Sequence, residues 1–349
     1  MQSPVPPYDG KPLAYIDQNV LDLVVKNVDW DFFQRLMDHF QVVYSDDTLR
    51  EIKRSGSPEK FLDALVSLDA AHFKIHVTDK FEVTDEFRVT RLSPHGAYAN
   101  FCLIDPVYDM MLAATRQTTL KMFGGRKESD FEDIDAEQLG AFNKLMGYIT
   151  EQLNSIDEIS QEQRNIVEQY QAALTSQYKE VLSISSDQMR QHVANAREWS
   201  GVRDYREATG AGPVELNNIK PPNVIEKIWA MYQNLDGYKG QGFTIEQFLG
   251  ISTSPIYARD MFLHEKVTAI YNLLNFIGYH QDSKLTKEAR HIAATSDAAH
   301  AAISVSVSLI LSCDRVFIKK VEAIYEHLQV NTTVGLVVVY DGLIVVTAS

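Results

Sequence analysis

Cysteine is scarce in this sequence, and long apolar runs are missing from it. The two cysteines, Cys102 and Cys313, show no metal-ligand spacing and do not suggest a disulfide framework, so we expect small buried residues in a reducing compartment. No stretch approaches the roughly 18 consecutive apolar residues that a membrane span needs. Residues 1–10 are proline-rich and polar, unlike a signal peptide. These absences predict a cytoplasmic protein without a membrane-spanning segment.

Basic residues are outnumbered by acidic ones. The chain has 33 lysines and arginines against 47 aspartates and glutamates, which gives a formal net charge of -14. This charge argues against broad, nonspecific attraction to nucleic acid. Binding to nucleic acid would therefore need a local basic patch, a bound metal ion or a partner. Lys53, Arg54, Lys319 and Lys320 are candidates for such a patch, although solvated helix faces carry the same residue types.

The pattern of apolar residues divides the chain into three parts, residues 11–105, 106–283 and 284–349. The first and last parts alternate short apolar runs with helical periodicity, which indicates an α/β fold with a parallel sheet flanked by helices. The middle part is helical in pattern almost throughout. We therefore predict an α/β core that is interrupted in sequence by a large all-helical insertion.

Two strand–helix units open the first part. Residues 13–16 form a short apolar run that predicts a buried strand, and Asp17 stands where this strand passes into a helix. Residues 40–44 repeat the pattern, and Ser45 or Asp46 can cap the helix that follows. The other elements expected here are a helix over 61–68 and extended segments over 73–77 and 87–92.

A long apolar stripe marks the middle part. Its members have helical spacing and are separated by Gln, Glu and Lys, which predicts an antiparallel helical arm or a coiled-coil seam. Two further helices are expected around 225–232 and 267–277, the first of them starting near Pro222. The stripe consists of Ile159, Ile166, Val167, Tyr170, Leu174, Tyr178 and Val181.

The last part returns to strand–helix alternation. Residues 293–307 have the pattern of a small-residue helix, and residues 308–312 that of a strand, which Asp314 follows. Next come a helix face over 317–328 and two strands over 333–339 and 343–346, with Asp341-Gly342 as a hairpin turn between the strands.

Four acidic residues stand where a sheet of this kind can bring them together. The active site of an open parallel sheet lies just past the carboxyl ends of its strands, where Asp17 and Asp314 are placed. Glu51 lies one turn into the helix after the second strand, and Asp297 lies inside the small-residue helix. Converging carboxylates repel one another unless a cation neutralises them, and oxygen ligands select hard metals. The sequence therefore predicts a Mg²⁺ or Mn²⁺ site.

The residues around these acids resemble a known family, the PIN domain. The acids occur in the order Asp, Glu, Asp, Asp within Tyr15–Leu21, Val42–Ile52, Ser296–Ala302 and Leu309–Phe317. The likeness covers the first ~100 and the last ~60 residues but not the helical middle. It implies a PIN-like, Rossmann-like fold and a metal-dependent nuclease that cuts single-stranded RNA. It also implies metal-binding and catalytic roles for Asp17, Glu51, Asp297 and Asp314.

The four acids also have simpler structural explanations. Asp17 and Asp314 could be helix caps, since aspartate is common at that position. Glu51 could be one of many solvated helix acids. Asp297 fits such an account less well, because an unpaired carboxylate is costly on a helix that otherwise has a buried composition.

A second group of residues are candidates for contacts with substrate. Two of them, Asn19 and Ser45, could assist the site through hydrogen bonds, although helix capping explains them as well. A third, His300, lies three residues after Asp297 on the same helix face and could position a phosphate or a water. A structural histidine paired with a helix or carboxylate group is the simpler account of it. The full group is Asn19, Ser45, His300, Lys319 and Lys320.

The first functional hypothesis is a metal-dependent endoribonuclease that hydrolyses phosphodiester bonds of single-stranded RNA, with DNA as a second substrate. Its insertion would regulate the enzyme, form a homo-oligomer or dock a regulatory protein, as in a toxin or an antiviral defence effector. The alternative is a catalytically inactive PIN-like scaffold that acts through the insertion, which the net charge favours. A third hypothesis, a haloacid-dehalogenase-type phosphohydrolase, requires a second aspartate where this chain has Asn19.

Overall fold

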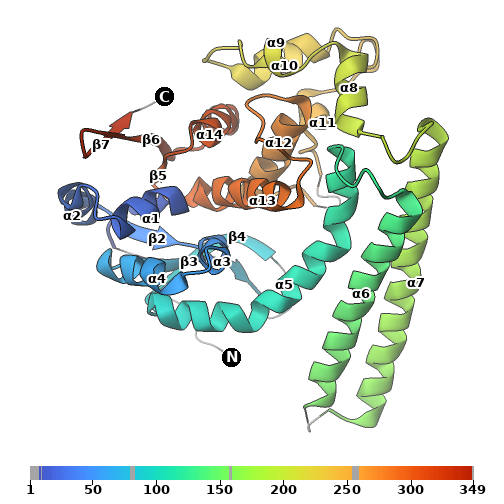
Figure 1. The fold of residues 1–349 in the computed structure, drawn as a ribbon, viewed down its shortest axis with the longest axis horizontal. Coiled ribbons are helices and arrows are strands. Elements are labelled where there is room, and N and C mark those ends of the chain that lie inside the picture. Colours follow the sequence, from blue (N-terminus) through green and yellow to red (C-terminus); the bar gives the residue numbers. More distant parts are fainter. Residues whose placement is uncertain (1–7, 9, 79–82, 157–158, 254–258, 348–349) are drawn as a thin grey trace. The chain divides into compact units, whose positions relative to one another are not determined.

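The computed structural model describes residue 8 and residues 10–78, 83–156, 159–253 and 259–347 (Figure 1). The prediction made for residues 1–10 therefore lies almost wholly outside the described residues. The chain forms two compact units. Unit 1 comprises Met1–Phe101, Arg206–Ser283 and Ile292–Ser349, and unit 2 comprises Cys102–Tyr205 and Lys284–His291.

Unit 1 is built on one sheet of seven strands in the order β4-β3-β2-β1-β5-β6-β7. Its five central strands are parallel, and an antiparallel strand closes each edge. This mixed α/β sheet agrees with the α/β class expected from the sequence. The strands are β1 (Leu13–Ile16), β2 (Gln41–Tyr44), β3 (Ala71–Val77), β4 (Val83–Thr90), β5 (Leu309–Ser312), β6 (Thr333–Tyr340) and β7 (Leu343–Thr347).

The order of the strands reverses between β1 and β5. From β1 the chain continues to β2 on one side, whereas from β5 it continues to β6 on the other side. Right-handed crossovers in opposite directions place their helices on opposite faces of a sheet. Ligands of open α/β sheets bind at such a switch point, beyond the carboxyl ends of the strands. The ends of β1 and β5, at Ile16 and Ser312, meet there.

The helices of unit 1 pack in two groups. One group comprises α1 (Gln18–Val25), α3 (Asp46–Arg54) and α4 (Pro58–Ser67), which contact one another, while α2 (Trp30–His39) contacts β2. In the other group, α10 (Val224–Tyr232) and α12 (Leu263–Ile277) pack on α14 (Arg315–Leu328). Residues 206–283, expected from the sequence to lie in the insertion, thus group with the sheet. Ile228 and Ile270 of this segment are fully buried.

Unit 2 contains a pair of long helices, α6 (Phe131–Asn154) and α7 (Gln161–His192), which pack along each other (Figure 1). Phe142 stacks on Tyr178 with 4.5 Å between ring centroids, and Leu145 and Leu182 are buried. The middle part of the chain thus contains two long helices that pack together, in agreement with its helical pattern. The apolar stripe is not the packing face throughout, however, because several of its members are exposed: Ile166, Tyr170, Leu174 and Val181.

Other elements expected from the sequence are present with small shifts of their ends. The turn between β6 and β7 has positive φ at both Asp341 and Gly342, as the expected two-residue hairpin turn requires. Among the described residues, no helix has both the length and the apolar character of a membrane span. The remaining helices are α5 (Pro94–Met122), α8 (Gly201–Thr209), α9 (Pro213–Leu216), α11 (Ile245–Leu249), α13 (Glu288–Ile303) and the 3-10 turn Ser304–Ser306.

Candidate metal centre

Asp17 is the first residue after β1 and lies at the switch point of the sheet. Its backbone N–H donates to Leu311 O of the adjacent strand at 3.1 Å. Its Oδ2 accepts hydrogen bonds from Ser312 Oγ at 2.7 Å and from Asn19 Nδ2 at 2.6 Å. Burial raises the pKa of Asp17, and the Glu51 charge adds to this effect, against the opposing influence of His300 and Ser312. The carboxylate is thus fixed in position but costly to keep ionised.

Glu51 reaches the same region from α3. A capping box sets the start of this helix, with Ser45 Oγ accepting from Thr48 N and Thr48 Oγ1 accepting from Ser45 N. The Glu51 side chain is 12% exposed. Burial raises its pKa, but His300 and Arg54 outweigh this, so the pKa of Glu51 lies below its ordinary value. Glu51 is therefore the acid of this region most readily kept ionised without a metal.

His300 lies on α13 and is 1% exposed. Its Nδ1 lies 2.6 Å from Tyr15 Oη, and Tyr15 Oη lies 2.7 Å from Ser45 Oγ and 3.1 Å from Thr48 Oγ1. Burial lowers the pKa of His300, but Tyr15, Glu51 and Asp17 together raise it well above its ordinary value. A chain of hydroxyl groups thus fixes the orientation of the imidazole ring.

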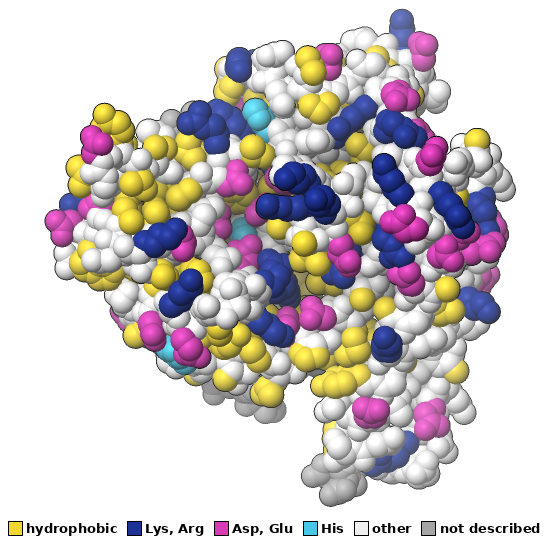
Figure 2. Space-filling view, in the orientation of Figure 1, with side chains coloured by type: hydrophobic (Ala, Val, Ile, Leu, Met, Phe, Trp, Pro, Cys, Tyr) yellow, Lys and Arg dark blue, Asp and Glu magenta, His cyan; other side chains and the backbone are white. Residues whose placement is uncertain are grey.

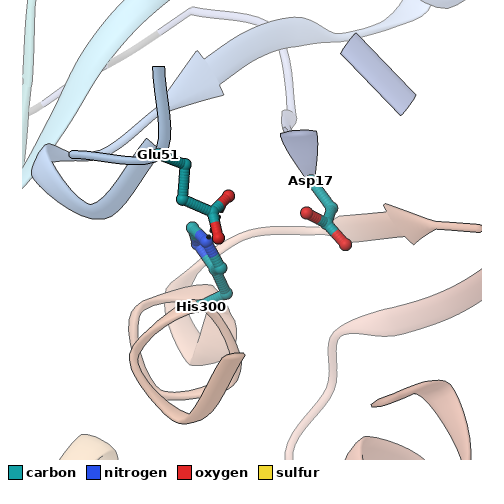
Figure 3. Close-up of side chains that lie close together, drawn as sticks. All are labelled: Asp17, Glu51 and His300. Carbon is teal, nitrogen blue, oxygen red and sulfur yellow. Dashed lines mark ion pairs between the residues drawn. The ribbon is translucent and has the colours of Figure 1, made fainter. Parts of the chain in front are cut away.

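Asp17, Glu51 and His300 converge on one point, as Figure 3 shows. Each offers a ligand atom, and these atoms all lie within 4.8 Å of one another. His300 Nε2 and Glu51 Oε2 are 3.2 Å apart. Within the described part of the chain, however, both of these buried atoms lack a hydrogen-bond partner of suitable geometry. Buried polar atoms without partners are rare, and a cation bound between them would satisfy both. The residues present therefore fit a metal ion.

Asp297 lies one turn before His300 on α13 and is half-buried. Burial raises its pKa well above the ordinary value, and the charges of Asp282, Asp17 and Glu51 raise it further, against the influence of His300. Asp297 is thus within the electrostatic reach of the three clustered residues, although it is not one of the group whose ligand atoms lie within 4.8 Å.

Replacing Asp297 by asparagine is expected to stabilise the protein in EDTA at alkaline pH, by on the order of 1 kcal/mol. The folded state holds the proton of Asp297 to a higher pH than the unfolded state does. Wild-type stability is therefore lost as pH rises from the ordinary aspartate pKa of about 3.9 through the raised folded pKa, and asparagine escapes this loss. Urea unfolding at about pH 4 and about pH 8 measures the difference.

The exposed Asp38 supplies the control for this measurement. Asp38→Asn is expected to change the unfolding free energy equally at both pH values. An Asp297→Asn variant whose stability relative to wild type does not grow with pH would show that burial and the neighbouring acids do not raise the pKa of Asp297 in the folded state.

Asp314 is placed two residues after β5 and caps α14. Its Oδ1 accepts hydrogen bonds from the backbone N–H groups of Val316 at 2.7 Å and of Phe317 at 3.1 Å. The side chain is exposed and does not belong to the clustered group. The helix-cap explanation considered for Asp314 is therefore the one that its contacts support.

Asn19 and Ser45 support the candidate centre through hydrogen bonds. Asn19 bonds Asp17, and its Oδ1 accepts from the backbone N–H of Cys313 at 2.7 Å, which ties α1 to the end of β5. Ser45 is fully buried between Tyr15 and the start of α3. Its burial leaves no surface for a substrate, so the role expected for Ser45 as a substrate contact does not fit the structure.

Lys320 is also fully buried, and so it is not part of a surface patch. Its Nζ donates to Asp282 Oδ1 at 2.6 Å and to Asn275 Oδ1 at 2.9 Å, and it lies 4.0 Å from the centroid of the Tyr271 ring. Burial lowers the pKa of Lys320, and the Asp282 charge opposes this. The substrate contact expected for Lys320 is thus replaced by an internal ion pair, while the half-buried Lys319 lies 3.8 Å from Glu322.

Positive charge near the candidate centre comes from Arg54. Its Nη2 donates to Ser296 Oγ at 2.9 Å, lies 3.5 Å from Glu51 Oε1, and belongs to a side chain that is 35% exposed. On the face drawn in Figure 2, Lys and Arg side chains lie among Asp and Glu side chains. The net negative charge of the chain therefore does not form an unbroken acidic surface on that face.

Two supporting residues, Tyr15 and Ser312, were not expected as such from the sequence. Tyr15 is fully buried, and a buried tyrosine hydroxyl usually has a hydrogen-bond partner, which was the only available signal. Ser312 ends β5 and binds Asp17 across the switch point. The structure thus brings together Asp17, Glu51 and His300 with this support. The chain matches no protein-family model, and neither curated proteins nor solved structures give a significant match to it.

Proposed function

We propose that this protein is a metal-dependent endoribonuclease with a PIN-like active site. The observation that carries the proposal is the cluster of Asp17, Glu51 and His300, whose ligand atoms lie within 4.8 Å of one another at the switch point of the sheet. The buried atoms His300 Nε2 and Glu51 Oε2 lie 3.2 Å apart and make no hydrogen bond of suitable geometry among the described residues, as expected of ligands prepared for a cation. Mg²⁺ and Mn²⁺ are the metals proposed for it.

The residues of the chain would have separate roles at this centre. Asp17 and Glu51 would hold the cation through carboxylate oxygens, with Asp17 kept in place by Ser312 and Asn19. A divalent cation bound there would supply Lewis-acid stabilisation of a phosphodiester and activation of water. Arg54, partly exposed beside Glu51, would pair with a phosphate of the substrate. Asp297, whose pKa is raised by burial and by the neighbouring acids, would be deprotonated more readily with a cation bound nearby.

The choice of RNA as substrate rests on the resemblance to PIN domains in the residues around Asp17, Glu51, Asp297 and Asp314. The net charge of -14 fits an enzyme that attracts nucleic acid weakly and depends on metal and local cations for binding. A regulatory partner or a second copy of the chain would supply further control, as in a toxin or a defence effector.

Purified protein is expected to cut single-stranded RNA in MnCl₂ or MgCl₂ and to leave it intact in EDTA. The test incubates labelled single-stranded RNA and single-stranded DNA of matched sequence with the protein and follows fragment lengths on denaturing gels. Internal cuts in RNA that need added metal support the proposal. Unchanged RNA in every metal tested, or cutting that persists in EDTA, would contradict it.

A scaffold role is the second candidate function, and one observation favours it. The helix α7 exposes apolar side chains along one face, with Tyr170 68% and Val181 62% exposed. Large exposed apolar side chains at helical spacing are typical of surfaces that bind another helix. A protein that binds no metal and cuts neither nucleic acid, yet loses a partner when Tyr170 and Val181 are replaced by serine, would fit this role instead.

A further inference from the structure

We propose that His300 binds the metal directly through Nε2, and that this nitrogen makes the centre selective for Mn²⁺ over Mg²⁺. The inference rests on the proposed function, since it concerns the cation of the same centre. It adds a nitrogen ligand to a site that the sequence predicts from carboxylates alone. It also states which of the two proposed metals, Mn²⁺ or Mg²⁺, this ligand favours.

The surroundings of the ring determine which of its nitrogens can bind a metal. His300 Nδ1 lies 2.6 Å from Tyr15 Oη, so this nitrogen is engaged on the side away from the cluster. His300 Nε2 belongs to a side chain that is 1% exposed, and it has no hydrogen-bond partner within the described part of the chain. It lies 3.2 Å from Glu51 Oε2, but neither atom makes a hydrogen bond of suitable geometry within the described residues. The nitrogen therefore faces the carboxylates of the cluster.

The hydroxyl network supports the tautomer that metal binding needs. When Nδ1 carries the proton and donates it to Tyr15 Oη, the Tyr15 hydroxyl is free to donate to Ser45 Oγ at 2.7 Å. A hydroxyl oxygen has two lone pairs, so Ser45 Oγ can accept from Tyr15 as well as from the backbone N–H of Thr48. With its proton on Nδ1, the imidazole presents the lone pair of Nε2 to the cluster. Metal-binding histidines usually donate their other N–H in this way, which fixes the ring and raises its basicity.

A nitrogen ligand changes which metals the centre prefers. Mg²⁺ is a small, hard cation that favours oxygen ligands in octahedral geometry and gives up its water reluctantly. Imidazole suits transition metals, whose affinities for mixed nitrogen and oxygen sites rise from Mn²⁺ through the first-row series. Two carboxylates and one imidazole thus favour Mn²⁺ over Mg²⁺, whereas carboxylates alone would distinguish the two metals less.

The competing arrangement is an ion pair in which His300 is protonated on both nitrogens and holds Glu51 by charge. In that case Nε2 has no lone pair, and any cation would be bound by oxygen atoms alone. The two arrangements differ in one spectroscopic property. A nitrogen that coordinates Mn²⁺ produces hyperfine coupling in the electron spin-echo spectrum of the bound ion, and an imidazolium beside the site does not.

The test titrates the metal-free full chain with MnCl₂ and with MgCl₂ by calorimetry and records spin-echo spectra of the Mn²⁺ complex. The wild type is expected to show nitrogen coupling, and His300→Gln is expected to lose it. Mn²⁺ affinity of His300→Gln should fall by at least the ~10–100-fold typical for loss of a residue that supports a metal ligand. Its Mg²⁺ affinity should change much less. Mn²⁺ bound to the wild type without nitrogen coupling would overturn the proposal, whatever the variant does.

Two further variants separate ligation from folding. His264 is a second buried histidine of unit 1, whose ring packs near Phe87 and Phe262. His264→Gln is expected to keep both the nitrogen coupling and the Mn²⁺ affinity, and loss of the coupling in this variant would count against His300. Tyr15→Phe keeps the aromatic ring of residue 15 but removes the hydroxyl that contacts His300 Nδ1. This variant should therefore weaken Mn²⁺ binding by ~10–100-fold. Unchanged binding by Tyr15→Phe would show that the hydroxyl chain does not prepare the ligand.

Cleavage assays on the same samples distinguish the two proposals. Nitrogen-coupled Mn²⁺ without cleavage of single-stranded RNA would contradict the nuclease function and support the assignment of His300 as a ligand. Metal-dependent cleavage without nitrogen coupling would do the reverse. If the wild type binds neither Mn²⁺ nor Mg²⁺, both proposals fail together, whereas binding of Mg²⁺ alone contradicts only the ligand assignment.

Discussion

Replacing Asp17 by asparagine is expected to lower metal-dependent cleavage of RNA by more than the ~100-fold that marks the loss of a metal's supporting residues. Asparagine has nearly the same shape and can still accept the hydrogen bond that Ser312 Oγ donates at 2.7 Å. It carries no negative charge, however, and so it is a poor ligand for a hard cation. The fold should tolerate the change, because burial already raises the pKa of Asp17 and penalises its charge.

Initial rates with single-stranded RNA at saturating MnCl₂ measure this effect, and Asp31→Asn serves as the matched control. Asp31 lies exposed in the first turn of α2, and its replacement should leave the rate unchanged. Circular dichroism confirms that both variants are folded. An Asp17→Asn variant that cuts at the wild-type rate would show that Asp17 does not bind a catalytic metal ion. The proposed function would then lose the metal centre on which it rests.

The strands that carry the candidate centre could be predicted because their apolar runs are short and uninterrupted. Leu13–Ile16 and Leu309–Ser312 are strands in the structure, and they pair in parallel, as the sequence pattern indicated. Strands that are covered on both faces are apolar throughout, so the pattern needs no knowledge of the partner strand. The placement of Asp17 directly after β1 follows from this pattern alone.

The part played by His300 could not be predicted in the same way. The sequence allows a structural histidine, and what distinguishes it is a contact with Tyr15, which lies 285 positions away in the chain. Which nitrogen is engaged, and which faces Glu51, depends on how α13 packs against β1 and α3. Periodicity within one element carries no information on such packing.

The role of Asp314 could not be predicted either, because a metal ligand and a helix cap have the same signature in sequence. Both place an aspartate between a buried strand and a helix, and only the contacts separate them. Asp314 Oδ1 binds two backbone N–H groups of its own helix, whereas the helix that follows Asp17 receives no cap hydrogen bond from the Asp17 side chain. The Asp17 carboxylate is therefore left for other partners.

The burial of Lys320 could be predicted from helical spacing, although its charge led to the expectation of an exposed side chain. Lys320 lies in the buried stripe of α14 that Phe317 and Ile324 also occupy, so helical spacing alone places it inside. A lysine is almost never fully buried unless it is paired, and its partner, Asp282, comes from the segment after α12. The position could be predicted from periodicity, but the identity of the partner could not.

Replacing Lys320 by methionine is therefore expected to destabilise unit 1 by about 3–5 kcal/mol, the usual cost of removing one partner of a buried ion pair. Methionine fills much of the same volume, so the loss reflects charge more than packing. Asp282 would lose the ammonium group 2.6 Å from its Oδ1, and Asn275 Oδ1 would lose a donor at 2.9 Å. The charges of Asp297 and Asp314, which also act on Lys320, would lose the cation that offsets them.

Urea unfolding followed by circular dichroism tests this expectation, and the neighbouring lysine provides the control. Lys319 is only half-buried, and its Nζ lies 3.8 Å from Glu322 Oε2, a longer and more exposed ion pair than that of Lys320, so Lys319→Met should cost less stability than Lys320→Met. The double variant Lys320→Met/Asp282→Leu removes both charges and should regain most of the lost stability, because desolvating the pair costs about as much as the pair returns. A Lys320→Met variant as stable as wild type would show that the buried ion pair with Asp282 contributes no net stability.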